Sequence, residues 1–135
     1  MRAEGTFSVV RFTPTEVKPE PAVETALPVG VATMEKQYEG AIAGRSATIF
    51  TSAFNAATGS GTYVALESFD GSVGGRQGAF NFVHSATTSG SDTSHAFFLV
   101  VPRSGTGALA GITGTGGLRV DADGTHRFWL DYELP

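Results

Sequence analysis

Cysteine is absent from this chain of 135 residues. Its absence excludes a disulfide framework, a thiolate zinc site and a cysteine nucleophile. Clusters of basic residues are missing as well, and the formal net charge is −4. Because a protein that binds nucleic acid needs a positive surface to displace counterions from the phosphates, we expect no nucleic-acid partner.

Long hydrophobic runs are also missing. No apolar stretch is long enough to span a bilayer, so we expect no membrane partner. Residues 1–6 lead straight into alternating sequence and lack the apolar core of a secretory signal. A cytoplasmic location is therefore the expectation.

What the chain does contain is typical of a β-protein. Apolar residues make up 41% of the sequence, and its 18 glycines are spread through segments in which apolar and polar residues alternate. Glycine in that setting usually supplies turns between strands. The length is that of a single domain with its own core, which we place at residues 1–135.

Eight segments predict strands because apolar, β-branched or aromatic residues alternate along them. They are residues 6–12, 33–39, 47–55, 62–69, 79–87, 95–101, 117–121 and 126–133. Such a set either closes into a barrel or stacks as a sandwich, since an open sheet would expose two long edges. We favour an all-β fold that forms a closed antiparallel barrel of about eight strands.

One connection stands out because it is long and rich in proline. Residues 13–30 contain Pro14, Pro19, Pro21 and Pro28, which exclude a central strand or a helix interior. We interpret this segment as an ordered loop that crosses one end of the domain. A loose excursion from the barrel is the alternative.

Two segments repeat one pattern of an aromatic residue, an acid, glycine, small residues and arginine. They are residues 38–45 and 69–76, and residues 107–111 are a fainter third copy. The repeated glycines suit tight turns with positive φ, so we interpret the repeat as one hairpin solution used twice.

The hairpin around Gly74 and Gly75 can be written out in register. If these two glycines form a two-residue turn, Val73 faces Arg76 and one face of the hairpin becomes strongly aromatic. That face carries Tyr63, Glu67, Phe69, Phe80, Phe82 and His84. A bulge at Gly75 would instead slip the register by one residue and separate Glu67 from His84. We favour the first register because a face with four aromatic rings is normally buried.

Glu67 and His84 then become diagonal neighbours in an aromatic interior. A buried carboxylate is costly unless it is paired, and an imidazole beside it could be the partner. Such a pair in a cavity is suited to acid–base chemistry, which makes Glu67 and His84 the candidate catalytic residues. The alternative is a core hydrogen bond that only fixes the hairpin. The candidate ligand-binding residues are Tyr63, Phe69, Phe80 and Phe82.

The remaining motifs do not indicate a metal site or a cofactor site. His84, His95 and His126 lack metal-ligand spacing, so no metal is expected, and His126 follows a turn and should be exposed. The two Gly-Thr-Gly motifs do not lie between a strand and a helix, and no cofactor is expected.

Residues 97–101 are apolar on both faces, which predicts that a loop or a second subunit covers one of them. A homo-oligomer is therefore one of the possibilities.

Residues 67–80 with His84, residues 38–45 and residues 102–111 resemble a bacterial family of small proteins of unknown function (a DUF family). The resemblance covers almost the whole chain. It implies an eight-stranded barrel like that of allene oxide cyclase, and it supplies no reaction. Cyclases of similar shape bind apolar substrates, but that analogy concerns the fold alone.

Three functions follow from these observations. The leading prediction is a binding module whose interior holds a small apolar or amphipathic molecule, with Glu67 and His84 as polar anchors. The first alternative is a cofactor-free isomerase or cyclase in which Glu67 and His84 transfer a proton. The second is a structural or oligomerising domain with a filled barrel.

Overall fold

The computed structural model describes residues 1–135 and is built almost entirely from strands. The elements are β1 (Arg2–Pro14), β2 (Val29–Gly40), β3 (Ile42–Asn55), β4 (Ser60–Val73), β5 (Arg76–Ser89), β6 (Asp92–Val100), the short 3₁₀ helix η1 (Gly107–Leu109), β7 (Thr113–Val120) and β8 (His126–Glu133). The prediction of an all-β, antiparallel fold with about eight strands is confirmed.

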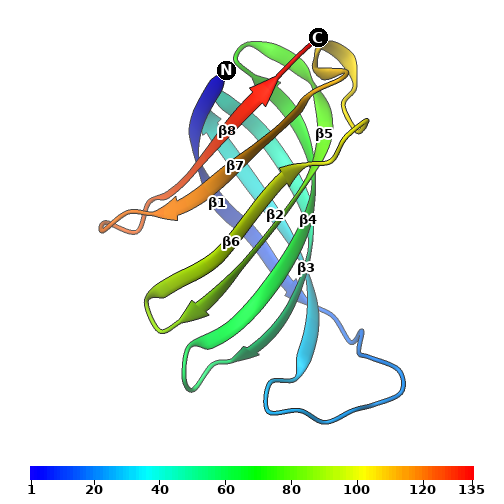
Figure 1. The fold of residues 1–135 in the computed structure, drawn as a ribbon, viewed down its shortest axis with the longest axis vertical. Helices are drawn as coiled ribbons and strands as arrows, with labels where there is room; N and C mark the ends of the chain where they lie inside the picture. The colour runs from blue at the N-terminus through cyan, green and yellow to red at the C-terminus, as the bar shows by residue number, and fades with distance from the viewer.

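The eight strands form one curved sheet in the order β6-β5-β4-β3-β2-β1-β8-β7. The sheet bends round until its two edge strands, β6 and β7, face each other without a hydrogen-bonded ladder (Figure 1). The barrel is therefore nearly closed and has one unsealed seam, where full closure was expected. The edge strands have nine and eight residues, against 12 to 14 in β1 to β5.

The predicted register of the β4–β5 hairpin is confirmed. Val73 pairs with Arg76, and Glu67 pairs with Phe82, while Ala65 pairs with His84. Gly74 and Gly75 form the turn with φ angles of 57° and 83°, which glycine adopts without strain. The even-numbered residues of β4 point outward, and Leu66 is half exposed.

The two repeated segments do not form equivalent hairpins, so the interpretation as one hairpin used twice is wrong. The first copy turns at Gly40, whereas the matching Gly71 lies inside β4 and pairs with Gly44 and Gly78. A Cβ on Gly71 would fall on the carbonyl oxygen of Ala43, so glycine here permits close packing of two strands. The third copy contains η1 instead of a hairpin.

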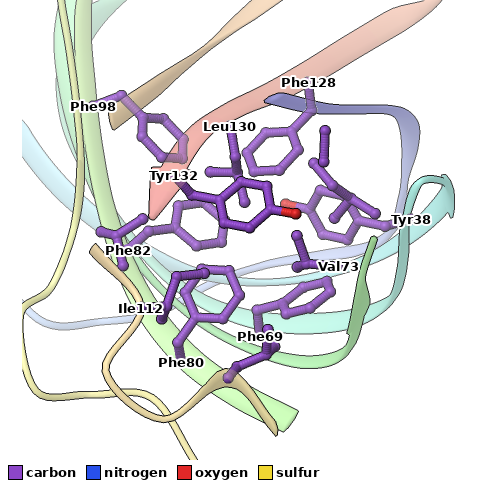
Figure 2. Close-up of a cluster of buried hydrophobic side chains, with 14 residues drawn as sticks. Tyr38, Phe69, Val73, Phe80, Phe82, Phe98, Ile112, Phe128, Leu130 and Tyr132 are labelled. Carbon is purple, nitrogen blue, oxygen red and sulfur yellow. The ribbon is translucent and has the colours of Figure 1, made fainter. Parts of the chain in front are cut away.

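The hydrophobic core fills the end of the barrel that carries both termini (Figures 1 and 2). Rings from β2, β4, β5, β6 and β8 point toward one another there (Figure 2). Leu109 of η1 and Ile112 after it are completely buried in the same cluster. The segment between β6 and β7 thus packs against this end of the barrel.

The proline-rich connection does not pack across the other end as expected. It projects from the ends of β1 and β2 (Figure 1), and of residues 15–28 only Leu27 is shielded in part. Prolines, glutamates and small valines give the loop little apolar surface to bury. No loop covers Phe97 of β6 either, and its side chain is 52% exposed.

Candidate functional site

Along the inner face of β4, the residues change from members of the packed core to residues of a cleft. Phe69 belongs to the packed core, and Glu67 is the next residue that points inward. Tyr63, the second inward-pointing residue after Glu67, lines the cleft. Glu67 therefore lies between the core and an open cleft at the other end of the barrel.

Glu67 is completely buried, and its carboxylate accepts four hydrogen bonds from residues of β2, β3 and β5. Oε1 accepts from the hydroxyls of Tyr38 and Ser46, each at 2.7 Å. Oε2 accepts from Nζ of Lys36 at 2.7 Å and Nε2 of His84 at 2.5 Å. Since a carboxylate can accept about four such bonds, its hydrogen-bonding capacity is filled.

These partners keep Glu67 ionised. Burial by itself would raise the pKa of Glu67, but the hydrogen bond from His84 and the positive charge of Lys36 outweigh it and lower the pKa to about 2. Burial and the nearby charge of Glu67 raise the pKa of Tyr38, and they raise the pKa of Tyr63 to about 12. Both phenols therefore stay protonated at neutral pH and act as hydrogen-bond donors.

His84 connects Glu67 to the cleft. Its Nε2 donates to the carboxylate, which can only accept, and its Nδ1 lies 2.8 Å from the hydroxyl of Tyr63. Tyr63 keeps its proton, and its hydroxyl can donate a hydrogen bond to Nδ1 or accept one from it. The result is a chain from carboxylate to imidazole to phenol that ends at the wall of the cleft.

Sequence analysis missed three members of this network: Lys36, Tyr38 and Ser46. Lys36 lies on the inner face of β2, because it has the same parity as the buried Tyr38, and it is only 3% exposed. That parity was a usable signal, but a lysine in an alternating strand is normally assigned to the solvated face. Burial of its ammonium depends on pairing with Glu67.

The cleft has a volume of about 730 Å³ and opens at the end opposite the core. Its wall includes Lys36, Tyr63 and His84, surrounded mainly by apolar and aromatic side chains. These include Phe7, Val9, Met34, Phe50, Phe97, Phe98, Leu118 and Trp129. Residues of β6 and β7 line it from both sides of the seam, so the unsealed edge forms part of the cleft.

The structure places the predicted site residues in two groups. Tyr63 and His84 line the cleft, and Glu67 lies directly behind them. The other three rings, Phe69, Phe80 and Phe82, belong to the packed core and do not line the cleft.

His126 also lies at the cleft, which corrects the expectation that it is exposed. Its ring stacks on Phe7 with 5.0 Å between centroids, and this contact shields part of the ring. His95 is exposed, and no three His, Asp or Glu side chains gather in an arrangement that could hold a metal ion.

The fold and the site define a small antiparallel β-barrel protein with a buried ionic network at the floor of an apolar cleft. Comparison with known proteins gives the family: residues 3–132 match "Protein of unknown function (DUF3224)", so the chain belongs to the DUF3224 family. A solved structure of a DUF3224 protein with unknown function from Shewanella oneidensis MR-1 is 29% identical to this chain, with a TM-score of 0.85. The match covers 100% of this chain and 97% of that one.

No curated protein matches the chain. No helix in the structure is long and apolar enough to cross a membrane.

Proposed function

We propose that the protein binds a small apolar or amphipathic molecule in the cleft. The observation that carries the proposal is the cleft itself, about 730 Å³ in volume and walled by aromatic and aliphatic side chains, with polar groups gathered at its floor. Small-molecule sites commonly have this size and this combination of an apolar wall with few polar groups. A barrel that served only as a scaffold would be expected to fill this end with side chains.

A second candidate function, a cofactor-free isomerase or cyclase, rests on the chain from Glu67 through His84 to Tyr63. Tyr63 can accept a proton from a bound molecule only while its own proton passes to Nδ1 of His84, because its raised pKa disfavours a phenolate. Glu67 would stabilise the imidazolium that forms. Exchange of an α-hydrogen of 2-acetonaphthone in D₂O, followed by NMR and abolished by His84→Gln, supports this function, and exchange at the solvent rate contradicts it.

Binding is tested with the apolar fluorophore N-phenyl-1-naphthylamine, whose emission rises in apolar surroundings. Val9 lines the cleft and is 41% exposed, whereas its neighbour Val10 is 55% exposed and does not line the cleft. Val9→Trp places a large ring in the cleft, so we expect it to weaken binding of the fluorophore by about tenfold or more.

Val10→Trp is the matched control, because it adds the same ring at the next residue. It should bind the fluorophore as the unmodified protein does. Equal affinities in all three proteins, or no binding at all, would rule out the cleft as a binding site and favour a structural domain.

A further inference from the structure

The ammonium group of Lys36 has donors that the protein does not use. An ammonium carries three N–H groups, and the only hydrogen bond of Nζ is the one to Glu67. Nζ also lies 4.8 Å from the centre of the Phe7 ring, which is a favourable cation–π distance but leaves the other hydrogens without an oxygen acceptor. Lys36 is among the residues that line the cleft, and 4% of its side chain is exposed, so a molecule must reach the floor of the cleft to meet these donors.

Two other charged groups near the cleft, Glu67 and Arg119, cannot hold a ligand in this way. Glu67 does not line the cleft, and its oxygens already accept four hydrogen bonds. Arg119 does line the cleft, but its side chain is 63% exposed and pairs with Asp121. A solvated guanidinium discriminates weakly between ligands, because water competes for its donors. Lys36 is therefore the cation that can anchor a bound molecule.

The charge balance around Lys36 favours an acceptor without charge. Lys36 and Glu67 already form a neutral pair in an apolar interior. A ligand carboxylate on Lys36 would bring a second anion next to Glu67, and two carboxylates that share one cation repel each other strongly when buried. A carbonyl oxygen accepts a hydrogen bond from Lys36 without this penalty.

The inner face of β3 carries a second uncommitted polar group, which does not itself line the cleft. The hydroxyl of Thr48 is buried and has no hydrogen-bond partner. Thr48 pairs with Met34 on β2, which lines the cleft, and with Glu67 on β4. A buried hydroxyl without a partner is unusual in a folded protein, and it places a further free hydrogen-bonding group at this part of the barrel.

We propose that the cleft selects an apolar carbonyl compound and that Nζ of Lys36 donates a hydrogen bond to its carbonyl oxygen. The inference rests on the proposed binding function and specifies the chemical class of the ligand. The apolar body of the molecule lies along the aromatic wall that includes Phe50 and Tyr63. Glu67 acts as a positioning residue that holds the ammonium in place.

The experiment compares three naphthalenes of similar shape: 2-acetonaphthone, 2-naphthoate and 2-ethylnaphthalene. Each competes with N-phenyl-1-naphthylamine for the protein. We expect the ketone to bind about tenfold or more tightly than the other two, which is the scale of one hydrogen bond to a charged group. 2-Nonanone and nonanoate provide the matching alkyl pair and show whether the carbonyl compound is aryl or alkyl.

Lys36→Met would leave Glu67 buried without its cation and risks unfolding, so the test variant is Lys36→Met with Glu67→Gln. This double variant removes both charges and should lose the preference for the ketone while it still binds 2-ethylnaphthalene. In the ketone complex of the unmodified protein, the infrared C=O band should shift to lower frequency, and the double variant should abolish that shift. Lys18→Met is the control, because it removes an exposed lysine that does not line the cleft, and it should retain the preference.

Several outcomes overturn the inference. Equal affinity for the ketone and 2-ethylnaphthalene shows that Lys36 does not anchor the ligand, and tightest binding of 2-naphthoate shows that the ligand is an acid. A ketone preference that survives in the double variant also contradicts it. In each of these cases the fluorophore still binds, so the proposed function stands. Failure of the fluorophore itself to bind overturns both.

Discussion

At the scale of single residues, the central feature is an ion pair that is buried inside the barrel. Glu67 is completely buried and Lys36 is 3% exposed, and each depends on the other for compensation of its charge. Removing one partner of such a pair leaves an uncompensated buried charge, which costs far more than the pair itself contributes. The free energies of unfolding of single and double variants can therefore separate the coupling between the two side chains from the effect of each side chain alone.

A double-mutant cycle tests this coupling. We expect Lys36→Met and Glu67→Gln each to lower the free energy of unfolding by about 3–5 kcal/mol. The double variant should be clearly more stable than the sum of the two losses predicts, because no lone charge remains. Urea denaturation of the four proteins gives the coupling energy, and strictly additive losses would show that the two side chains do not form a pair in solution.

The acid stability of the protein should depend on Glu67. Its pKa is lowered from 4.5 to about 2 in the folded state, so the ionised carboxylate contributes stability above about pH 5. That contribution is lost as the pH falls from about 4.5 toward 2, and at about 1.4 kcal/mol per pKa unit it amounts to about 3 kcal/mol.

The comparison needed is the free energy of unfolding against pH for the unmodified protein and the double variant. Asp121, Asp123 and Asp131 also have lowered pKa values, but these residues are the same in both proteins. The difference between the two curves thus isolates the ion pair. A constant difference from pH 7 to pH 2 would contradict the low pKa of Glu67.

Sequence reasoning found Glu67, His84 and Tyr63 because the parity of one hairpin places them together. It missed Lys36, since a lysine is normally assigned to the solvated face of a strand even where its parity matches that of a buried residue such as Tyr38. Only the pairing of β2 with β3 and β3 with β4 brings Lys36 to Glu67, and that pairing is not encoded in either strand alone.

At the scale of strands and hairpins, glycines allow β3 and β4 to approach each other closely. A Cβ on Gly71 would meet the backbone of Ala43 and would lie 2.8 Å from the Cα of Gly44. Gly30 also lies in a strand, β2, but a Cβ there would have no atom within 4 Å. The two glycines therefore form a matched pair for substitution.

Gly71→Ala should lower the free energy of unfolding by about 1–3 kcal/mol, because the strands must move apart to accept the methyl group. Gly30→Ala should change it by no more than about 0.5 kcal/mol. Thermal denaturation of both variants provides the measurement. Equal effects would mean that the close approach of β3 and β4 does not occur in solution.

The register of β4 and β5 was predictable because aromatic residues of one parity require one buried face, and a two-residue glycine turn fixes the pairing. The extent of the strands was less predictable. Glycines near residue 71 resemble a turn in sequence, and their role as contact points appears only when β3 lies beside them. The proline-rich loop was misplaced because its prolines indicated an ordered crossing, whereas its few apolar residues give it little surface to pack against the barrel.

At the scale of the whole molecule, the seam between β6 and β7 distinguishes this barrel from a fully closed one (Figure 1). The seam separates β6 from β7. Whether these two strands pair depends on the accumulated curvature of the whole sheet, so no local sequence pattern could predict that the seam stays open. Its residues line the cleft, which links the incomplete closure to the proposed binding function.

Hydrogen exchange should reveal the seam. The backbone amides of β6 and β7 that face the seam have no ladder partner, so we expect them to exchange much faster than those of β3 and β4, which are paired on both sides. Exchange followed by NMR resolves the individual amides. Equal protection of seam-facing amides and those of β4 would show that the barrel closes in solution.

The central claim is that the cleft holds an apolar molecule whose carbonyl oxygen contacts Lys36. A crystal structure of the protein with 2-acetonaphthone tests it most directly. We predict that the naphthalene ring lies in the cleft beside Phe50 and Tyr63, with its carbonyl oxygen within hydrogen-bond distance of Nζ of Lys36. A ketone bound only on the outer surface, or a barrel whose side chains fill the cleft, would contradict the account.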